Sequence, residues 1–236
     1  MSQQKKVVVV FDLDETITTI DTFPFLLIRV LAKRPSRWLK ALHLPFLYGL
    51  YLMGRYDNTK LKQKATETIL GGLEASEVSE IASWIVDALV KSHLRPRAAW
   101  VLEAHRSAGH HTILATASFD FYVGDLAKRL GFETVLCTPL IWRNGRVGSQ
   151  NGLENCYGSE KARRVRQWLD QSLENAHIIA YSDSSADVPL FELADVAVAV
   201  NGSKNLKRLG IAHGSQDWQD VDKAQEDFDE VLQQSM

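Results

Sequence analysis

The stretch Val7-Val8-Val9-Val10-Phe11-Asp12-Leu13-Asp14-Glu15-Thr16 decides the fold of this chain. Its β-branched and aromatic run predicts a strand that is apolar on both faces, as in the centre of a parallel sheet. The two carboxylates that follow, Asp12 and Asp14, are costly to bury without a partner. Because open α/β sheets bind ligands at the carboxyl ends of their strands, the pair predicts a cation site, and Mg²⁺ is the usual ion for carboxylate oxygens. The alternative is an acidic turn that caps a helix.

The composition is that of an ordinary globular protein. The chain has 236 residues, of which 45% are hydrophobic and 24% charged, with a net charge of −2. This balance lacks the basic excess that is typical of nucleic-acid binding. Two cysteines, Cys137 and Cys156, make no disulfide framework and indicate a reducing compartment. Residues 1–6 lead directly into the first strand without a cleavable signal, so we expect a cytoplasmic protein.

The region from about residue 21 to 95 has helical periodicity and almost no strand signal. Gly71-Gly72 interrupts this region, and Arg95-Pro96 marks its end. The apolar residues of its clearest helix fall on one face: Val78, Ile81, Ile85 and Leu89.

Two stretches of this helical region, 23–31 and 41–54, are almost wholly apolar and have basic flanks. Both are shorter than the roughly 20 residues that a membrane-spanning helix needs, and Pro24 and Pro45 interrupt them. They either pack inside the protein or lie in a membrane interface. The second alternative implies a peripheral contact of the chain with the inner face of the membrane.

From about residue 97 onward, strands and helices alternate. Such alternation predicts an α/β fold, a Rossmann-like parallel sheet with helices on both faces. Residues 1–20 and 97–236 would form this core, and residues 21–96 a helical cap inserted after the first strand. The signals are strands at 111–116, 134–138, 177–181 and 196–200, a helix that ends before Gly131, a helix that begins at Ser159, and the hairpin turns Asn144-Gly145 and Asn151-Gly152.

Further polar residues follow the predicted strands or begin helices. Thr116 ends a buried strand, where its hydroxyl could hold a phosphoryl oxygen, whereas Ser118 is better explained as the cap of the next helix. Lys161 lies in the first turn of a helix, where a cation opposes the helix dipole but can neutralise a bound anion. Asp183 and Asp187 leave another buried strand, and with the first carboxylate pair they predict an oxygen-ligand site for Mg²⁺.

These four motifs, in this order and spacing, resemble those of the haloacid dehalogenase (HAD) superfamily of aspartate-nucleophile phosphatases over nearly the whole chain. The helical insertion is similar to the cap of the phosphoserine-phosphatase-like subfamily IB. The resemblance implies that Asp12 is the nucleophile that becomes an aspartyl-phosphate. It implies that Asp14 is the acid that protonates the leaving oxygen and later activates water.

The same resemblance implies the remaining roles. Asp12, Asp183 and the backbone carbonyl of Asp14 would hold Mg²⁺, while Thr116 and Lys161 would bind the phosphoryl group. Asp187 would orient the metal shell through water or through Lys161.

This chain departs from the family pattern at three places. The last motif reads Ser182-Asp183-Ser184-Ser185-Ala186-Asp187, without the glycines that many relatives carry. Glu15 occupies a position where glycine or serine is commoner. Asp21 stands where phosphoserine phosphatases carry a glutamate that contacts the substrate amine, so it is a candidate specificity residue.

The resemblance favours hydrolysis of a small soluble phosphomonoester such as phosphoserine or histidinol phosphate. A lipid phosphatase of the phosphatidylglycerophosphate type is the first alternative, since residues 21–55 are similar to the cap of such enzymes. A phosphotransferase would share both aspartates of the first motif. A non-catalytic module that binds Mg²⁺ and phosphate is an alternative of another class.

Overall fold

A parallel sheet of six strands, in the order β3-β2-β1-β6-β7-β8, forms the centre of the protein. The computed structural model describes residues 6–173, 175–201, 206, 214–216, 218 and 224–234. Residues 1–5, on which the expectation of no cleavable signal rests, lie outside the described residues. The strands are β1 (Val7–Phe11), β2 (His111–Phe119), β3 (Thr134–Thr138), β6 (His177–Ser182), β7 (Val196–Val200) and β8 (Gly214–Gln216).

The first strand is central, as its apolar run predicts. β1 pairs in parallel with β2 and with β6, and Phe11 is in register with Leu114 on one side and Tyr181 on the other. Because three neighbouring strands are aligned at this level, the residues that follow them meet at one edge of the sheet. The register therefore brings Asp12 close to Asp183.

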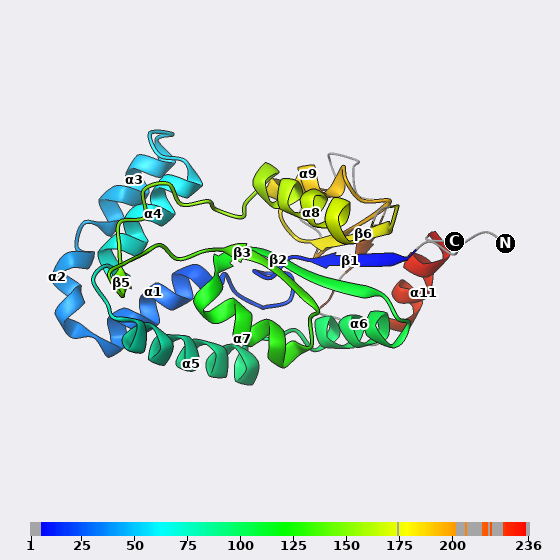
Figure 1. Cartoon of the computed structure of the whole chain (residues 1–236), viewed down its shortest axis with the longest axis horizontal. Helices are drawn as coiled ribbons and strands as arrows, with labels where there is room; N and C mark the ends of the chain where they lie inside the picture. The colour runs from blue at the N-terminus through cyan, green and yellow to red at the C-terminus, as the bar shows by residue number, and fades with distance from the viewer. Residues whose placement is uncertain are drawn as a thin grey trace.

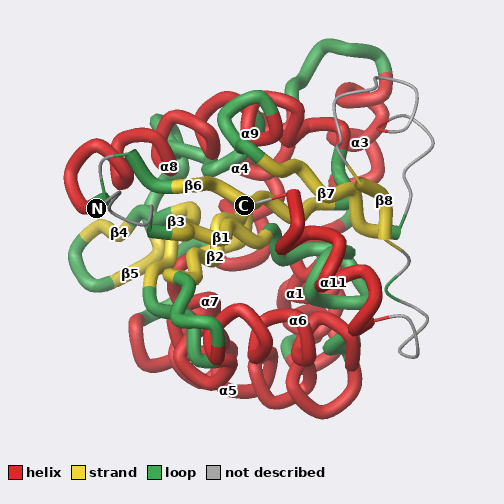
Figure 2. Tube along the Cα trace, turned by 90° about the vertical axis from the view of Figure 1, so that its right-hand side faces the viewer, coloured by secondary structure: helices red, strands yellow, loops and turns green. Residues whose placement is uncertain are grey.

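Helices cover both faces of the sheet, which confirms the predicted fold class (Figures 1 and 2). Alternate residues of β1 enter two different buried clusters, Val9 and Phe11 on one face and Val8 and Val10 on the other. Both faces are covered because both carry apolar side chains. One face holds α5 (Ala75–Ser92), α6 (Pro96–Ser107), α7 (Asp120–Leu130) and α11 (Ala224–Gln234), and the other holds α8 (Ser159–Ser172) and α9 (Val188–Phe191).

Several predicted boundaries are confirmed. β3 and β7 have the predicted bounds, α8 begins at Ser159, and α7 ends before Gly131, whose φ is 83°. The hairpin of β4 (Trp142–Arg143) and β5 (Arg146–Val147) turns at Asn144-Gly145, where both residues have positive φ.

β2 is longer than predicted, because it continues to Phe119 through an irregularity between Ala115 and Phe119. Thr116 therefore lies within this strand and not at its end.

Five helices follow β1 along the chain before α6 leads into β2, and the first four of them occupy the left-hand end of the molecule in Figure 1. Arg129 of α7 pairs with Asp87 of α5 at 2.7 Å, so the last of these helices lies against the layer that covers the sheet. The division into a core of residues 1–20 and 97–236 and a cap of residues 21–96 stays a prediction. The helices are α1 (Thr22–Lys33), α2 (Trp38–Ala41), α3 (Leu44–Leu52), α4 (Asn58–Leu70) and α5, with a 3₁₀ turn at Pro35–Arg37.

Candidate active site

A buried lysine joins two of the predicted site carboxylates. Nζ of Lys161 donates to Oδ1 of Asp12 and to Oδ2 of Asp187, both at 2.7 Å. All three side chains are less than 10% exposed. Ser182 donates to the same oxygen of Asp187 at 2.7 Å, which fixes that carboxylate beneath the lysine. The predicted link between Asp187 and Lys161 is therefore present.

Burial and the neighbouring charges together set the protonation states of Asp12 and Lys161. Burial raises the pKa of Asp12 well above its usual value, Lys161 opposes the rise, and the carboxylates of Asp187, Asp14 and Asp183 add to it. Although burial lowers the pKa of Lys161, the contacts with Asp12 and Asp187 outweigh it and raise that pKa. The lysine is thus held as a cation, as phosphate binding requires.

The N-terminal turn of α8 places Lys161 by an unusual backbone. Gly158 precedes the helix with φ 57° and ψ −126°, a conformation that residues with a Cβ rarely adopt. This turn brings the beginning of α8 to the carboxyl edge of the sheet. The helix N-terminus itself favours an anion at this place.

Thr16 holds the predicted metal ligands Asp12 and Asp183 on either side of its hydroxyl. Its Oγ1 lies 3.2 Å from Oδ2 of Asp12 and 3.1 Å from Oδ1 of Asp183, and it accepts the backbone N–H of Asp183 at 3.0 Å. Sequence reasoning missed this role. The only sequence signal was a hydroxyl residue in the turn that directly follows β1, four residues after Asp12.

The residues present fit a small hard cation. No group of three or more His, Cys, Asp or Glu side chains is arranged to hold a metal ion within the described residues. Mg²⁺, however, keeps several waters and takes one or two carboxylates together with substrate phosphate oxygens. Asp12 and Asp183 supply two such carboxylates, and no cation pairs with Asp183 in the described part of the chain. Burial raises the pKa of Asp183 to about 6. Asp183 is therefore a largely buried carboxylate whose charge no cation of the described residues neutralises.

Asp14 turns away from this pair and is fixed by the start of α1. Its Oδ1 accepts the backbone N–H of Thr22 at 2.7 Å, and its Oδ2 accepts the hydroxyl of Ser118 at 2.8 Å. Because Ser118 donates its hydrogen to Asp14, Thr22 must donate to Ser118 and Tyr122 to Thr22, over 2.7 and 2.8 Å. The two aspartates of the first motif thus have separate partners, as their separate predicted roles require.

The expectation that Ser118 caps a helix is wrong. α7 has Phe119 at its N-cap and no side-chain capping bond, because β2 runs on to Phe119 and Ser118 lies inside it. Ser118 instead contacts Asp14 and lines the site cavity. Thr116 is fully buried, accepts the N–H of Ser118 at 3.0 Å and lies 3.5 Å from Asp14, so its phosphate-binding role stays a prediction.

A cavity of about 470 Å³ opens above these residues. Its floor is the carboxyl edge of the sheet, and its wall is the helical segment between β1 and β2. The wall side chains are mainly apolar or aromatic, and they include Phe23, Pro24, Leu27, Leu44, Tyr48, Tyr51, Leu61 and Ala65.

Lys62 is a second buried cation of the site, which sequence reasoning treated only as part of a basic flank. It is 5% exposed, donates to the backbone carbonyl of Ala117, and has its Nζ 4.7 Å from the ring centroid of Phe119. Burial lowers the pKa of Lys62 to about 8 despite nearby carboxylates. Its spacing from Ala65 and Ile69, which are also buried, is the sequence signal that places it on the inner face of α4.

Asp21 lies at the cavity wall and also caps α1. Its Oδ1 accepts the backbone N–H of Phe23 at 2.9 Å. Burial raises the pKa of Asp21 to about 6, and the charge of Asp14 adds to the rise. Its predicted contact with a substrate stays a prediction, because capping alone accounts for its position.

A parallel α/β sheet with an aspartate pair, a buried lysine and further carboxylates at its carboxyl edge defines a class of hydrolases. The sequence model of the haloacid dehalogenase-like hydrolase family matches residues 9–192, and the chain belongs to this family. The predicted assignment to phosphatases of the HAD type is confirmed.

Two relatives and one solved structure are similar to this chain over most of its length. The chain is 26% identical over 212 residues to the Mycobacterium tuberculosis (strain H37Rv) protein "Probable phosphatase Rv3661", with 86% of this chain and 72% of that protein aligned. Protein CicA of Caulobacter vibrioides is 31% identical over 191 residues, which cover 79% of this chain and 82% of CicA. A substrate-bound phosphoserine phosphatase has the same fold, with a TM-score of 0.67, 15% identity, and 95% and 99% of the two chains covered.

Proposed function

We propose that this protein is a Mg²⁺-dependent phosphomonoesterase that acts through an aspartyl-phosphate on Asp12. The contact of Lys161 with both Asp12 and Asp187 carries the proposal, because it fixes a permanent cation beside a carboxylate nucleophile. Such a cation lowers the repulsion between Asp12 and an incoming phosphate dianion. Bound Mg²⁺, held by Asp12, Asp183 and the carbonyl of Asp14, would neutralise charge that develops on the transferred phosphoryl group.

The two aspartates divide the reaction between them. A carboxylate oxygen of Asp12 forms a bond to phosphorus while the ester P–O bond breaks, and Asp14 gives a proton to the leaving oxygen. In the second half, Asp14 takes a proton from water, the water oxygen bonds to phosphorus, and the bond to Asp12 breaks. Inorganic phosphate leaves, and both aspartates return to their first state.

We further propose a small phosphorylated metabolite, of the phosphoserine or histidinol phosphate type, as substrate. A cavity of about 470 Å³ accommodates such a molecule, and the Asp21 carboxylate at its wall suits a substrate amine. The fold shared with phosphoserine phosphatase supports this class. The apolar side chains of the wall favour a second candidate, a phosphorylated lipid headgroup with part of its apolar body.

Release of inorganic phosphate from an aryl phosphate tests the reaction. We expect release with Mg²⁺, none after chelation, and none from Asp12→Asn, which is nearly isosteric and removes the nucleophile. Turnover by Asp12→Asn would contradict the nucleophile assignment. No release at any Mg²⁺ concentration would instead favour a non-catalytic module that binds Mg²⁺ and phosphate.

A substrate panel separates the remaining candidates. Phosphoserine, histidinol phosphate, sugar phosphates and phosphatidylglycerophosphate are compared by kcat/KM on the same preparation. Preference for a soluble amino phosphate supports the first candidate, and preference for the lipid supports the second.

A further inference from the structure

A large apolar surface covers the outside of α2 and α3. We call it the α2–α3 face and define it by Trp38, Leu39, Leu42, Phe46, Leu52 and Met53, which are between 61% and 81% exposed. Single exposed apolar residues are normal on proteins, but these six all fall within residues 38–53, and such a concentration of exposed apolar side chains marks an interaction surface. In Figure 1 α2 and α3 lie at the end of the long axis opposite to α11.

Packing inside the protein does not account for this surface. α1 buries Leu26 and Val30 and has Arg29 on its outer side, as an amphipathic helix does. α3 buries only Leu47, and its sequence Leu-Pro-Phe-Leu-Tyr-Gly-Leu-Tyr-Leu has no charged residue on any side. A helix that is apolar all round needs a second apolar neighbour besides the core.

The charge around the α2–α3 face is opposite to that of the whole chain. Between Thr22 and Tyr56 the sequence has six arginines or lysines and no aspartate or glutamate, although the net charge of the protein is −2. Arg34 is paired with Glu77 and Glu80 of α5 and is not counted toward the face. Lys40 and Arg55, which flank the face, are exposed. Apolar side chains inside a basic border are the pattern of a helix that lies in an anionic lipid interface.

We propose that the α2–α3 face docks this protein on an anionic membrane surface. Phe46, Leu52 and their apolar neighbours would enter the interface, while Lys40 and Arg55 would contact lipid phosphates. A second copy of the chain fits less well, because a symmetric contact would bring the two basic borders together. None of the helices in the described part of the chain is both long and apolar enough to cross a bilayer.

Helix α3 connects the α2–α3 face to the active site. Leu44 and Tyr51 of α3 line the site cavity, and Tyr48 both lines it and is 53% exposed. Docking through α3 would thus place the cavity next to the lipid surface. The proposal concerns binding and stands apart from the proposed function, since it requires no turnover.

Flotation with vesicles tests the proposal. We expect the full chain to float with vesicles of phosphatidylcholine and phosphatidylglycerol at low salt, and much less at high salt or with phosphatidylcholine alone. The double variant Leu39→Ser/Phe46→Ser should bind at least about tenfold more weakly, because two apolar side chains no longer enter the interface. Lys40→Glu should weaken binding about tenfold through its reversed charge.

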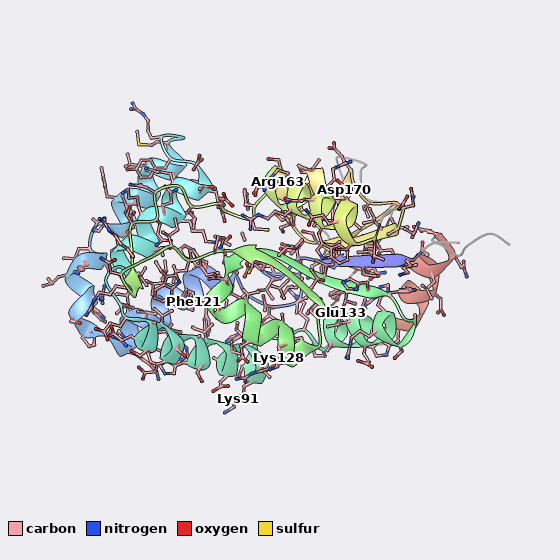
Figure 3. The ribbon with its side chains drawn as sticks, viewed as in Figure 1. Lys91, Phe121, Lys128, Glu133, Arg163 and Asp170 are labelled. Carbon is pink, nitrogen blue, oxygen red and sulfur yellow. The ribbon has the colours of Figure 1, made fainter. Side chains whose placement is uncertain are left out.

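Matched controls come from α5. Val90→Ser and Lys91→Glu change an exposed apolar and an exposed basic residue away from the face, and they should bind as the unchanged protein does. Figure 3 shows Lys91 pointing away from the body of the protein. Asp12→Asn should float normally, and the face variants should release phosphate from an aryl phosphate at the normal rate, which separates this proposal from the reaction.

Three outcomes would overturn the proposal. The first is no flotation of the unchanged chain with anionic vesicles, and the second is flotation that the face variants do not weaken. The third is a concentration-dependent dimer that Phe46→Ser dissociates, which would assign the face to a second copy.

Discussion

Lys161 contributes to the packing of the site and, in the proposed reaction, to its chemistry. Its ammonium compensates two carboxylates in a place from which water is nearly excluded. Removal of one partner from such a group leaves buried charge without compensation. We expect Lys161→Met to lower the free energy of unfolding by about 3 kcal/mol, measured with urea in the absence of Mg²⁺, and to abolish phosphate release.

Lys128→Met is the control for this measurement. Lys128 lies on the exposed side of α7, so its replacement should change stability by less than about 0.5 kcal/mol. An equal effect of the two substitutions would show that Lys161 contributes no more than a surface lysine.

Glu15 carries backbone strain next to the two site aspartates. Its φ of 57° is left-handed, a conformation that costs glycine little but is strained for a residue with a Cβ. Glu15→Gly should relieve this strain and raise the free energy of unfolding by about 0.5–1 kcal/mol, after the entropy that glycine loses on folding. Thermal unfolding measures the change. Glu15→Ala removes the same charge but keeps a Cβ, so it should not raise the free energy of unfolding. If Glu15→Ala raised it as much as Glu15→Gly does, the backbone would not be the cause.

Helices and strands could be predicted from the sequence where a single pattern of apolar residues, helical or extended, continued without interruption. The valine run of β1 and the Ser159 start of α8 were predicted correctly for this reason. β2 was predicted too short because its last residues pass through an irregularity of pairing, and no periodic pattern marks such a bend. β8 was missed, since Gly214-Ser215-Gln216 has no β-branched residue and pairs only because β7 offers an edge.

The beginning of α8 is the element whose geometry places the buried lysine. Gly158 has φ 57° and ψ −126°, and a Cβ there would lie 3.5 Å from the carbonyl oxygen of Ala186, so the obstacle is the backbone and not space. Gly158→Ala should lower the free energy of unfolding by about 1–2 kcal/mol and reduce phosphate release, because Lys161 shifts with the turn.

Gly124→Ala should change the free energy of unfolding in the opposite direction to Gly158→Ala. Gly124 is inside α7, and a Cβ at this residue would have no atom within 4 Å, so alanine should stabilise the protein by about 0.5–1 kcal/mol without affecting phosphate release. If both substitutions stabilised the protein, the turn before α8 would not be strained.

At the scale of the whole molecule, the motifs predicted which residues meet but not how each is held. Parallel strands of equal register bring their carboxyl ends together, so Asp12 and Asp183 could be predicted as neighbours. The contacts of Thr16 and Ser118 depend on hydroxyl directions that a sequence pattern does not encode. The exposure of α3 could not be predicted either, because an apolar helix looks the same in sequence whether it is buried or docked.

A buried histidine links the sheet to its helical cover and makes the stability of the whole protein depend on pH. His105 of α6 is fully buried, its Nε2 lies 2.9 Å from the hydroxyl of Tyr181, and its Nδ1 lies 2.8 Å from Nδ1 of His110. Burial, and to a lesser extent His110, lowers the pKa of His105 to about 3. The unfolded chain binds a proton at this residue below about pH 6.5, where the folded protein does not.

The stability contributed by neutral His105 is therefore complete above about pH 6.5 and is lost as the pH falls from there toward about 3. The loss amounts to at most about 1.4 kcal/mol for each pH unit. His105→Gln cannot take up this proton, so its free energy of unfolding, measured with urea at several pH values, should fall less steeply than that of the unchanged protein. The variant is less stable at neutral pH, but only the slope tests the prediction. Equal slopes would mean that His105 binds its proton alike in the folded and unfolded chain.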